Sequence, residues 1–484
     1  MMPPGGHGRW RPARVVTQSL LLSMLMIVIM VGLLSPSNEV VVTRDVVFAS
    51  PGPAGTLGPS PTATSGPPKS ATPLKCGMSV EGLDEETIEA LVFLETAMIE
   101  RQDRFLTNPQ SPESKFVMFH CDGRHRSRGG LGDRMVGLMD AFAFAVVLER
   151  ALIISWDQYT PLSRYLRPNV LWWDSTFFDQ GAFDGEEDIF DCYDVCPRGL
   201  WHGSIEFPGR LLHIESNLPF AGAIYDNPHP NNAKYRMDLL NGKHGLVFRF
   251  MFHLLFKLSP EMHDVFAPFA RVLHPPDRTH TVIGVHVRTG GMGAWQDPSF
   301  GNEELYDVYK QYAVMLYNTV PGLNARPLRF MVITDSAELL EEARFADRTI
   351  MSSDSTGLPI THIDRPGPDT FEWSARAFLD VFLLASADAL VISRSGFSEH
   401  ASALSCAPTV AMLTPMNPSR EFAGDEGRVL TRGLCTPLPS REEGHLSNLD
   451  PGQYGDSLMT FKEAKEAAQA GRNVFAPGAL KYVG

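Results

Sequence analysis

The stretch TVIGVHVRTGG, residues 281 to 291, changes from apolar to cationic and then to glycine within a few positions. Its apolar part predicts a buried strand, and Arg288 stands where that strand ends. The guanidinium fork of Arg288 suits phosphate, and Gly290 and Gly291 let a main chain approach a ligand closely. His286 shares the face of Arg288, because strand residues two apart point the same way. The spacing alone also allows Arg288 to pair with a surface acid and His286 to be an ordinary core histidine.

A second pattern that favours phosphate is SRSGFSEHASALS, residues 393 to 405, where a predicted strand passes into a helix. Its hydroxyl groups and the unpaired amides at the start of the helix suit an anion. The candidate contacts are Ser395, Gly396, Phe397 and Ser398. Ordinary helix capping by Ser395 or Ser398 is the alternative.

Asp380 lies within FLDVFLLASAD, an otherwise apolar helical stretch. A buried carboxylate needs a partner. A guanine edge, which offers two adjacent N–H donors, is one such partner, and a structural arginine or lysine is another. Asp335 follows a further apolar run and belongs to the same predicted binding site.

The earlier stretch GRHRSRGGLGDRMVGLMDAF, residues 123 to 142, places several arginines around a glycine-rich turn that begins a helix. Positive charge at a helix start is unfavourable without an anion nearby, so Gly130, Gly132 and Arg134 are candidate substrate contacts. The glycine spacing fits neither the G-x-G-x-x-G nor the P-loop pattern. A solvated basic loop is the alternative.

These residues need elements that position them. Residues 116 to 156 predict a β-α-β unit, whereas residues 157 to 245 predict loops and short elements. From residue 281, apolar strands alternate with helices, which predicts a parallel sheet covered on both faces. Ligands of such sheets bind beyond the carboxyl ends of the strands, where Arg288, Asp335 and the serines after residue 393 fall. Two α/β domains facing each other would form a cleft.

The amino-terminal region predicts a membrane anchor and a stem. Residues 15 to 34 form an uncharged, largely apolar run of spanning length, and the arginines before it place the body in the lumen. A cleaved signal peptide is the alternative. The Pro- and Ser-rich residues that follow read as a stem. The six cysteines, all luminal on this topology, permit disulfides, with Cys192 and Cys196 as a local pair or, less favourably, zinc ligands.

The predicted organisation is a cytosolic tail (1–14), a signal anchor (15–34), a stem (35–75), an amino-terminal α/β domain (76–275), a carboxyl-terminal Rossmann-like domain (276–440) and an extension (441–484). This arrangement predicts a single-pass type II protein of the Golgi membrane. The formal net charge of −14 makes nucleic acid an unfavourable partner.

Together these stretches resemble a known family. GGLGDRMVGLMDAFAFAVVLERALIISW resembles the first motif of plant xyloglucan-type fucosyltransferases. GVHVRTG, VITDS and FLDVFLLASADALVISRSGFSEHASAL resemble the GDP-binding motifs of α1,2-, α1,6- and protein O-fucosyltransferases. The four motifs occur in the family's order between about residues 116 and 415.

The resemblance implies a GT-B enzyme that transfers fucose from GDP-fucose to a glycan with inversion and without a metal or other cofactor. The acceptor glycan would approach from the amino-terminal domain (76–275), and the carboxyl-terminal domain would hold GDP-fucose. Arg288 would clamp the phosphates and act in catalysis, Asp380 would read guanine, and Ser395 with the following amides would hold the β-phosphate. His286 would line the nucleotide site. The chain contains no Asp-x-Asp triplet that would bind a metal on a diphosphate.

The chain also departs from the family. A single Arg288 stands where the α1,6 enzymes carry two arginines, and Asp133 replaces the usual asparagine of the first motif. Asp133, Asp297 and Glu372 are therefore the candidates for a general base, and Asp133 can instead orient its loop. Two other functions stay open: a transferase of the same fold that uses another nucleotide sugar, and a non-catalytic luminal protein that binds glycans.

Overall fold

The computed structural model describes residues 74–80, 83–121, 129–156, 161–178, 183, 185–192, 205–217, 221–240, 243–275, 277–289, 306–320, 322–336, 339, 349–361, 363, 367–368, 370–393, 395–405, 407–413, 428–432 and 457–460. All of them belong to the compact unit Ser50–Gly484. Within these ranges, no helix has both the length and the apolar character needed to span a membrane. The predicted anchor and nearly all of the stem lie outside the described residues, as do Asp297, Gly290, Gly291 and the arginines before Gly129.

The first part of the described chain, residues 74 to 275, is called the N lobe here. Its sheet contains, among the described residues, β2 (Ala151–Ser155), β1 (Phe116–His120), β5 (Leu211–Ser216) and β4 (Glu187–Cys192), in that order and all parallel. Helix α3 (Leu131–Val147) connects β1 to β2, which confirms the predicted β-α-β unit. The long helix α2 (Glu85–Thr107) precedes this unit and is capped by the Asp84 carboxylate, which accepts a hydrogen bond from the Thr87 amide.

The described elements between residues 157 and 243 are short, as expected, and two of them, the strands β4 and β5, complete the sheet of the N lobe. Strand β4 lies at the edge of the sheet, and Ile189 is 70% exposed. An edge strand is paired on one side only and carries charged residues, so it lacks the apolar run of a central strand. The sequence EDIFDC therefore gives a weak strand signal.

The remaining elements of the N lobe are short, apart from two helices that follow residue 243. The helices are α4 (Ala221–Asp226), α5 (Pro230–Lys234), α6 (Met237–Leu240), α7 (His244–Leu255) and α8 (Pro260–Leu273), the 3₁₀ turns are η1 (Leu162–Arg164) and η2 (Ser175–Phe177), and β3 (Leu166–Pro168) pairs antiparallel with β6 (Phe256–Leu258).

The second part, residues 277 to 460, is called the C lobe. Its described strands are β7 (Thr281–Val287), β8 (Leu328–Thr334), β9 (Thr349–Met351), β10 (Ala389–Ser393), β11 (Thr409–Leu413), β12 (Arg428–Arg432) and β13 (Ser457–Thr460), and its helices and turns are α9 (Tyr306–Thr319), η7 (Leu323–Ala325), η8 (Ser353–Thr356), α11 (Phe371–Ala385) and α12 (Gly396–Ser405). The sheet order in this part of the chain is β13-β12-β11-β10-β7-β8-β9.

The strands from β9 to β11 are parallel, as the alternation of strands and helices predicts. Strands β12 and β13 are antiparallel additions that the sequence analysis does not predict. β13 belongs to the predicted carboxyl-terminal extension and joins this sheet. The fold is thus mixed α/β with two largely parallel sheets.

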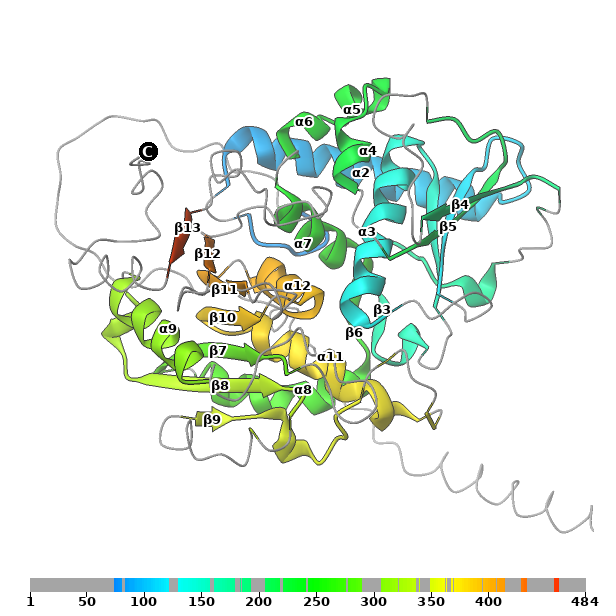
Figure 1. The fold of residues 1–484 in the computed structure, drawn as a ribbon. Coiled ribbons are helices and arrows are strands. Elements are labelled where there is room, and N and C mark those ends of the chain that lie inside the picture. The colour runs from blue at the N-terminus through cyan, green and yellow to red at the C-terminus, as the bar shows by residue number, and fades with distance from the viewer. Residues whose placement is uncertain are drawn as a thin grey trace, which may run out of the picture. The chain divides into compact units, whose positions relative to one another are not determined.

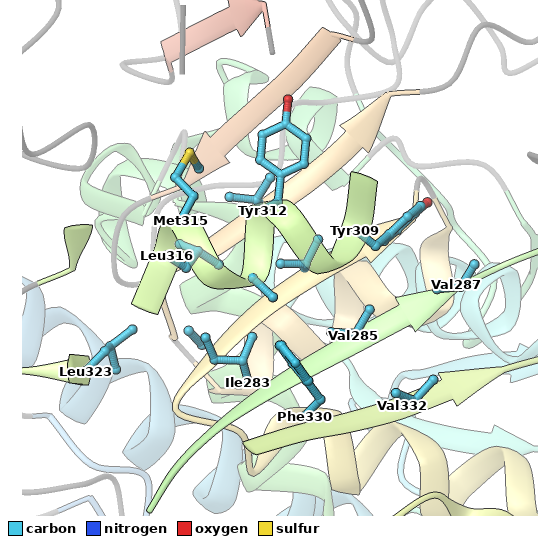
Figure 2. Packing of buried hydrophobic residues seen from close by; sticks show 14 of the residues in the cluster. Ile283, Val285, Val287, Tyr309, Tyr312, Met315, Leu316, Leu323, Phe330 and Val332 are labelled. Atoms are coloured by element: carbon cyan, nitrogen blue, oxygen red, sulfur yellow. The ribbon is translucent and has the colours of Figure 1, made fainter. Parts of the chain in front are cut away.

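Both faces of the C-lobe sheet are covered. On one face, Tyr312 and Leu316 of α9 pack over Ile283 and Val285 of β7 and Phe330 of β8 (Figure 2). On the other face, an added methyl at Gly284 would meet Leu384 and Ala387, so α11 lies close to the sheet there. His286 and Arg288 have the same parity as Gly284 and therefore belong to the α11 side of β7.

The two lobes meet along an aromatic seam. Helix α12 packs on α7 and α3 of the N lobe (Figure 1). Tyr165 stacks on Phe378 with ring centroids 4.4 Å apart, and its hydroxyl donates to the Phe371 carbonyl at 2.9 Å. The ring centroids of Phe248 and His400 are 4.4 Å apart. Stacked rings that are buried bind the lobes more firmly than a polar surface would.

Candidate functional site

The main chain of Arg288 is fixed at the carboxyl end of β7. Its N–H donates to the hydroxyl of Ser393, the last residue of β10, at 2.8 Å. The Ser393 hydroxyl donates to the His286 carbonyl at 3.0 Å. It also lies 2.9 Å from the Tyr309 hydroxyl, and because Ser393 has only one proton to donate, Tyr309 is the donor of that bond. Ser393 thereby uses its proton and both lone pairs to hold the end of β7.

Asp335, which follows β8, braces the next residue of the same loop. Its Oδ1 accepts a hydrogen bond from the Thr289 N–H at 2.7 Å and from the Thr289 hydroxyl at 3.0 Å. The structure thus brings together Arg288, Asp335 and Ser393 at the edge where the sequence places them. The contacts of Asp335 are those of a residue that shapes the loop, and direct binding of substrate by Asp335 stays a prediction.

The serines around the start of α12 form the turn that leads out of β10. The Ser398 hydroxyl is buried and lies 3.1 Å from the Ser393 carbonyl and 3.3 Å from the Ser395 carbonyl. The Glu399 N–H donates to the Ser395 carbonyl at 3.0 Å. Ser398 therefore holds the turn closed, so that Ser395, Gly396 and Phe397 are the residues at the mouth of the helix. Helix starts carry a partial positive charge, which favours an anion there.

His286 lies behind this helix start with unused hydrogen-bonding capacity. It is 5% exposed, and its Nδ1 has no hydrogen-bond partner among the described residues. Its ring centroid lies 5.3 Å from that of Phe397. Burial lowers the pKa of His286 to about 4, against the influence of Asp335 and in the same direction as that of Arg288. The imidazole is therefore neutral at pH 7 and suited to a neutral hydrogen bond with a ligand.

The starts of α3 and α12 touch each other across the seam. A Cβ built on Gly132 would lie 2.5 Å from the Phe397 amide nitrogen and 2.6 Å from the Gly396 carbonyl carbon. Only glycine permits this approach of two main chains. The glycine-rich turn of the first motif and the helix start of the last motif, more than 260 positions apart, thus form one place in the fold.

Two neighbours of Gly132 make contacts within the protein. The Asp133 carboxylate accepts a hydrogen bond from the Gly130 N–H at 3.1 Å, so it caps α3 and orients the loop. Arg134 is fully buried, and its guanidinium donates to the carbonyls of Gly129 at 3.2 Å and of Ile363 in the C lobe at 3.1 Å. A catalytic role of Asp133 and substrate binding by Arg134 stay predictions.

Asp380 is buried in α11 beside Arg376, one helical turn earlier. Their closest atoms, Arg376 Nε and Asp380 Oδ2, are 3.8 Å apart, and Asp380 Oδ1 has no hydrogen-bond partner among the described residues. Burial raises the pKa of Asp380 to about 7, although Arg376 and the Ser353 hydroxyl favour the charged form. The structural arginine that the sequence analysis leaves open is present, yet it does not satisfy the carboxylate.

A comparison with solved structures finds proteins that are similar to this chain. A mutant of Arabidopsis thaliana FUT1 in complex with GDP is similar, with a TM-score of 0.46 and 14% identity over 69% of this chain and 80% of that chain. NodZ α-1,6-fucosyltransferase soaked with GDP-fucose gives 0.37 and 15% over 62% and 95%, and Bradyrhizobium NodZ gives 0.36 and 16% over the same shares. No family model and no curated protein sequence matches the chain.

The similar structures are fucosyltransferases, the class of enzyme that the four motifs resemble. TM-scores below 0.5 and identities below 25% do not by themselves establish a shared activity. The functional argument therefore depends on the residues of this chain.

Several residues of the site are not predicted from the sequence. Tyr309 and Ser353 come from elements whose position relative to β7 and α11 only the fold determines. Arg376 carries a usable signal, because residues four apart on a helix share a face and Asp380 is its neighbour there. Glu372, a predicted base, lies in the first turn of α11.

The side chains of most of the cysteines are not among those that the structure describes. Cys76 is buried with a free thiol, and burial raises its pKa to about 12, which makes it unreactive at neutral pH. The side chains of Cys192 and Cys196 are not among those described, so their pairing stays a prediction.

Proposed function

We propose that this chain is a glycosyltransferase of the GT-B type that moves fucose from GDP-fucose to a glycan hydroxyl, with inversion and without a metal ion. The observation that carries the proposal is the arrangement at the edge of the C-lobe sheet. Arg288 is held there by Ser393, and the start of α12 and the unpartnered Nδ1 of the buried His286 belong to the same edge. A cation, a helix start and a neutral imidazole together suit a nucleoside diphosphate.

The nucleobase would be read by Asp380. Its Oδ1 lacks a partner, and a carboxylate is the natural acceptor for the two adjacent N–H donors of a guanine edge. Guanine rather than uracil is favoured, because uracil presents one ring N–H between two carbonyl oxygens. This argument supports a GDP-linked sugar over a UDP-linked one.

In the proposed reaction, an oxygen of the acceptor attacks the anomeric carbon of fucose on the face opposite the diphosphate. The new C–O bond forms while the bond from that carbon to the β-phosphate oxygen breaks, which inverts the configuration. The acceptor hydroxyl passes its proton to a general base, for which Asp133, Asp297 and Glu372 are the candidates, and GDP leaves with the electron pair of the broken bond. Arg288 and the amides at the start of α12 would stabilise the negative charge that develops on the departing diphosphate, a contribution of about 3 kcal/mol or more to the barrier.

The acceptor would approach from the N lobe, where the glycine-rich turn containing Gly130 and Gly132 faces α12. The anchor and stem read from the sequence support a type II Golgi membrane protein whose body is luminal.

The test is donor binding and transfer by the full chain in detergent. Calorimetry with GDP, UDP, GDP-fucose and GDP-mannose should show binding of the guanine nucleotides and weak or no binding of UDP. Release of GDP from GDP-fucose in the presence of glycan acceptors should depend on Arg288. GDP at about 100 times its dissociation constant should stabilise the fold by roughly 2.7 kcal/mol. No stabilisation by GDP would contradict the proposal, and turnover with GDP-mannose alone would correct the sugar.

A further inference from the structure

Two buried polar atoms on α11 have no hydrogen-bond partner among the described residues, Arg376 Nε and Asp380 Oδ1. The hydroxyl of Ser353, at the start of η8, lies close enough to Asp380 to favour its charged form. Ser353 is 1% exposed, Arg376 3% and Asp380 7%. Buried polar atoms are nearly always hydrogen-bonded, so an unsatisfied donor beside an unsatisfied acceptor indicates a binding site rather than a chance defect.

The guanidinium of Arg376 is held in place from its far side. Its Nη1 donates to Asp354 Oδ1 at 3.0 Å and to the Leu358 carbonyl at 3.1 Å. These two bonds leave the Nε–H as the donor on the side of Asp380, 3.8 Å from Oδ2. The distance is too long for a hydrogen bond, so Arg376 and Asp380 stand side by side as a donor and an acceptor, both unsatisfied.

A ligand that satisfies both must present an acceptor next to a donor. The six-membered ring of a 6-oxopurine does so, because O6 is an acceptor and N1–H beside it is a donor. The 2-amino group of guanine adds a second donor on the side of the carboxylate. An adenine edge presents the 6-amino donor and the N1 acceptor in the opposite order, which would leave its amino group facing the arginine.

We infer that Arg376 is a specificity-determining residue that reads the 6-oxo group of the purine, while Asp380 reads the N–H groups beside it. Arg376 donates its Nε–H to O6, and the Ser353 hydroxyl borders the same edge. This inference rests on the proposed function, because it assumes that the donor is a guanine nucleotide. Arg376 would thus select nucleotides that carry a 6-oxo group, in addition to the selection for N–H donors by Asp380.

The experiment compares GDP with 6-thio-GDP, in which sulfur, a weak acceptor, replaces O6 while N1–H and the 2-amino group remain. Calorimetry on the full chain should show that the wild type binds 6-thio-GDP roughly 10 to 100 times more weakly than GDP. Arg376→Lys keeps the positive charge next to Asp354 and Asp380 but removes the fixed Nε–H. It should weaken GDP binding and bind the two nucleotides about equally.

Inosine diphosphate, which lacks only the 2-amino group, is the control ligand. Its deficit relative to GDP should be the same in the wild type and in Arg376→Lys, because Arg376 does not face that group. Equal binding of GDP and 6-thio-GDP by the wild type would overturn the inference, and so would an Arg376→Lys protein that still discriminates between them. The wild-type comparison needs no variant to fold. A wild type that binds no GDP would instead contradict the proposed function.

Discussion

At the scale of single residues, Ser393 determines where the main chain of Arg288 lies. Its hydroxyl is the meeting point of three hydrogen bonds, from Arg288 and Tyr309 and to the His286 carbonyl. The hydroxyl thus links β10, β7 and α9 at the place where the phosphates are proposed to bind. A phosphate clamp of this kind depends on the anchoring of its main chain as much as on the charge of its side chain.

Ser393→Ala should lower the free energy of unfolding by about 1 to 3 kcal/mol, because it leaves the Arg288 N–H and the His286 carbonyl without their partner. GDP binding should weaken as well, since Arg288 loses its anchor. Urea denaturation and calorimetry measure the two effects. Ser386→Ala is the matched control, because that hydroxyl donates only to the Phe382 carbonyl of its own helix. Equal behaviour of the two variants would refute the anchoring role.

Asp380 should make GDP binding depend on pH. Its pKa of about 7 in the free protein means that the carboxylate must lose a proton before it can accept N–H groups from guanine. GDP affinity should therefore fall by up to about tenfold per pH unit as the pH drops below 7. Calorimetry between about pH 5.5 and 8 measures how GDP affinity changes with pH. Asp380→Asn should bind more weakly and lose the pH dependence.

The same group should affect stability in the opposite direction. The folded, unliganded protein retains the proton of Asp380 up to about pH 7, whereas the unfolded chain loses it near the ordinary value of 3.8. Between these values the folded state binds more protons, so the contribution of Asp380 to stability decreases as the pH rises. Comparing the pH dependence of urea unfolding for the wild type and Asp380→Asn isolates this contribution. An unchanged dependence in the variant would contradict the raised pKa.

At the scale of elements, the contact between the starts of α3 and α12 joins the first and last motifs. Gly132→Ala should destabilise the protein by about 1 to 3 kcal/mol and disturb GDP binding, because its methyl would strike the main chain of α12. The partner glycine offers a matched control. A Cβ on Gly396 would meet Gly132 at 3.5 Å, an ordinary contact, so Gly396→Ala should be tolerated sterically. Equal destabilisation of the two variants, measured by urea denaturation, would contradict the asymmetry of the contact.

The sequence predicts the elements of the C lobe well, because apolar strands in a covered parallel sheet give an unmistakable pattern. The stretch of residues 393 to 405, where a strand is predicted to pass into a helix, contains the end of β10 and the whole of α12. The edge strand β4 could not be predicted in the same way, since its sequence EDIFDC mixes acidic and apolar residues without a regular period and Ile189 is exposed. The strand β13 occupies residues 457 to 460 of the carboxyl-terminal extension, for which the sequence analysis predicts no strand.

The residues of the candidate site also differ in how well the sequence predicts them. The edge residues Arg288, Asp335 and Ser393 could be predicted, because a doubly wound sheet brings strand ends together whatever the details of packing. The contact of Gly132 with α12 could not, because it depends on how two lobes pack. The environment of Asp380 could be predicted in part. Helix geometry places Arg376 next to Asp380, whereas only the fold brings Ser353 close to them.

At the scale of the whole molecule, the aromatic seam makes the lobes depend on each other. Tyr165 of the N lobe is buried between Phe371 and Phe378 of α11, and α12 packs on both α3 and α7. A seam of this composition resembles a protein core. Domains that meet through a polar contact are usually free to move relative to each other, and this seam is not of that kind. The described residues of the two lobes should therefore unfold together.

Tyr165→Ala should lower the free energy of unfolding by about 3 to 5 kcal/mol, the cost of removing a large buried ring. Unfolding followed by circular dichroism and by tryptophan fluorescence should remain a single coincident transition in the wild type. Val272→Ala, on an exposed position of α8, serves as the control and should change little. Two separate transitions in the wild type would show that the lobes are independent.

The central claim is that one guanine nucleotide joins the edge of the C-lobe sheet to Asp380. A crystal structure of the chain with GDP tests it most directly. The account predicts diphosphate oxygens within hydrogen-bonding distance of the Arg288 guanidinium and the amides that open α12, with the guanine edge against Asp380. GDP bound elsewhere, or Arg288 occupied by an acidic side chain while GDP binds without it, would contradict the account.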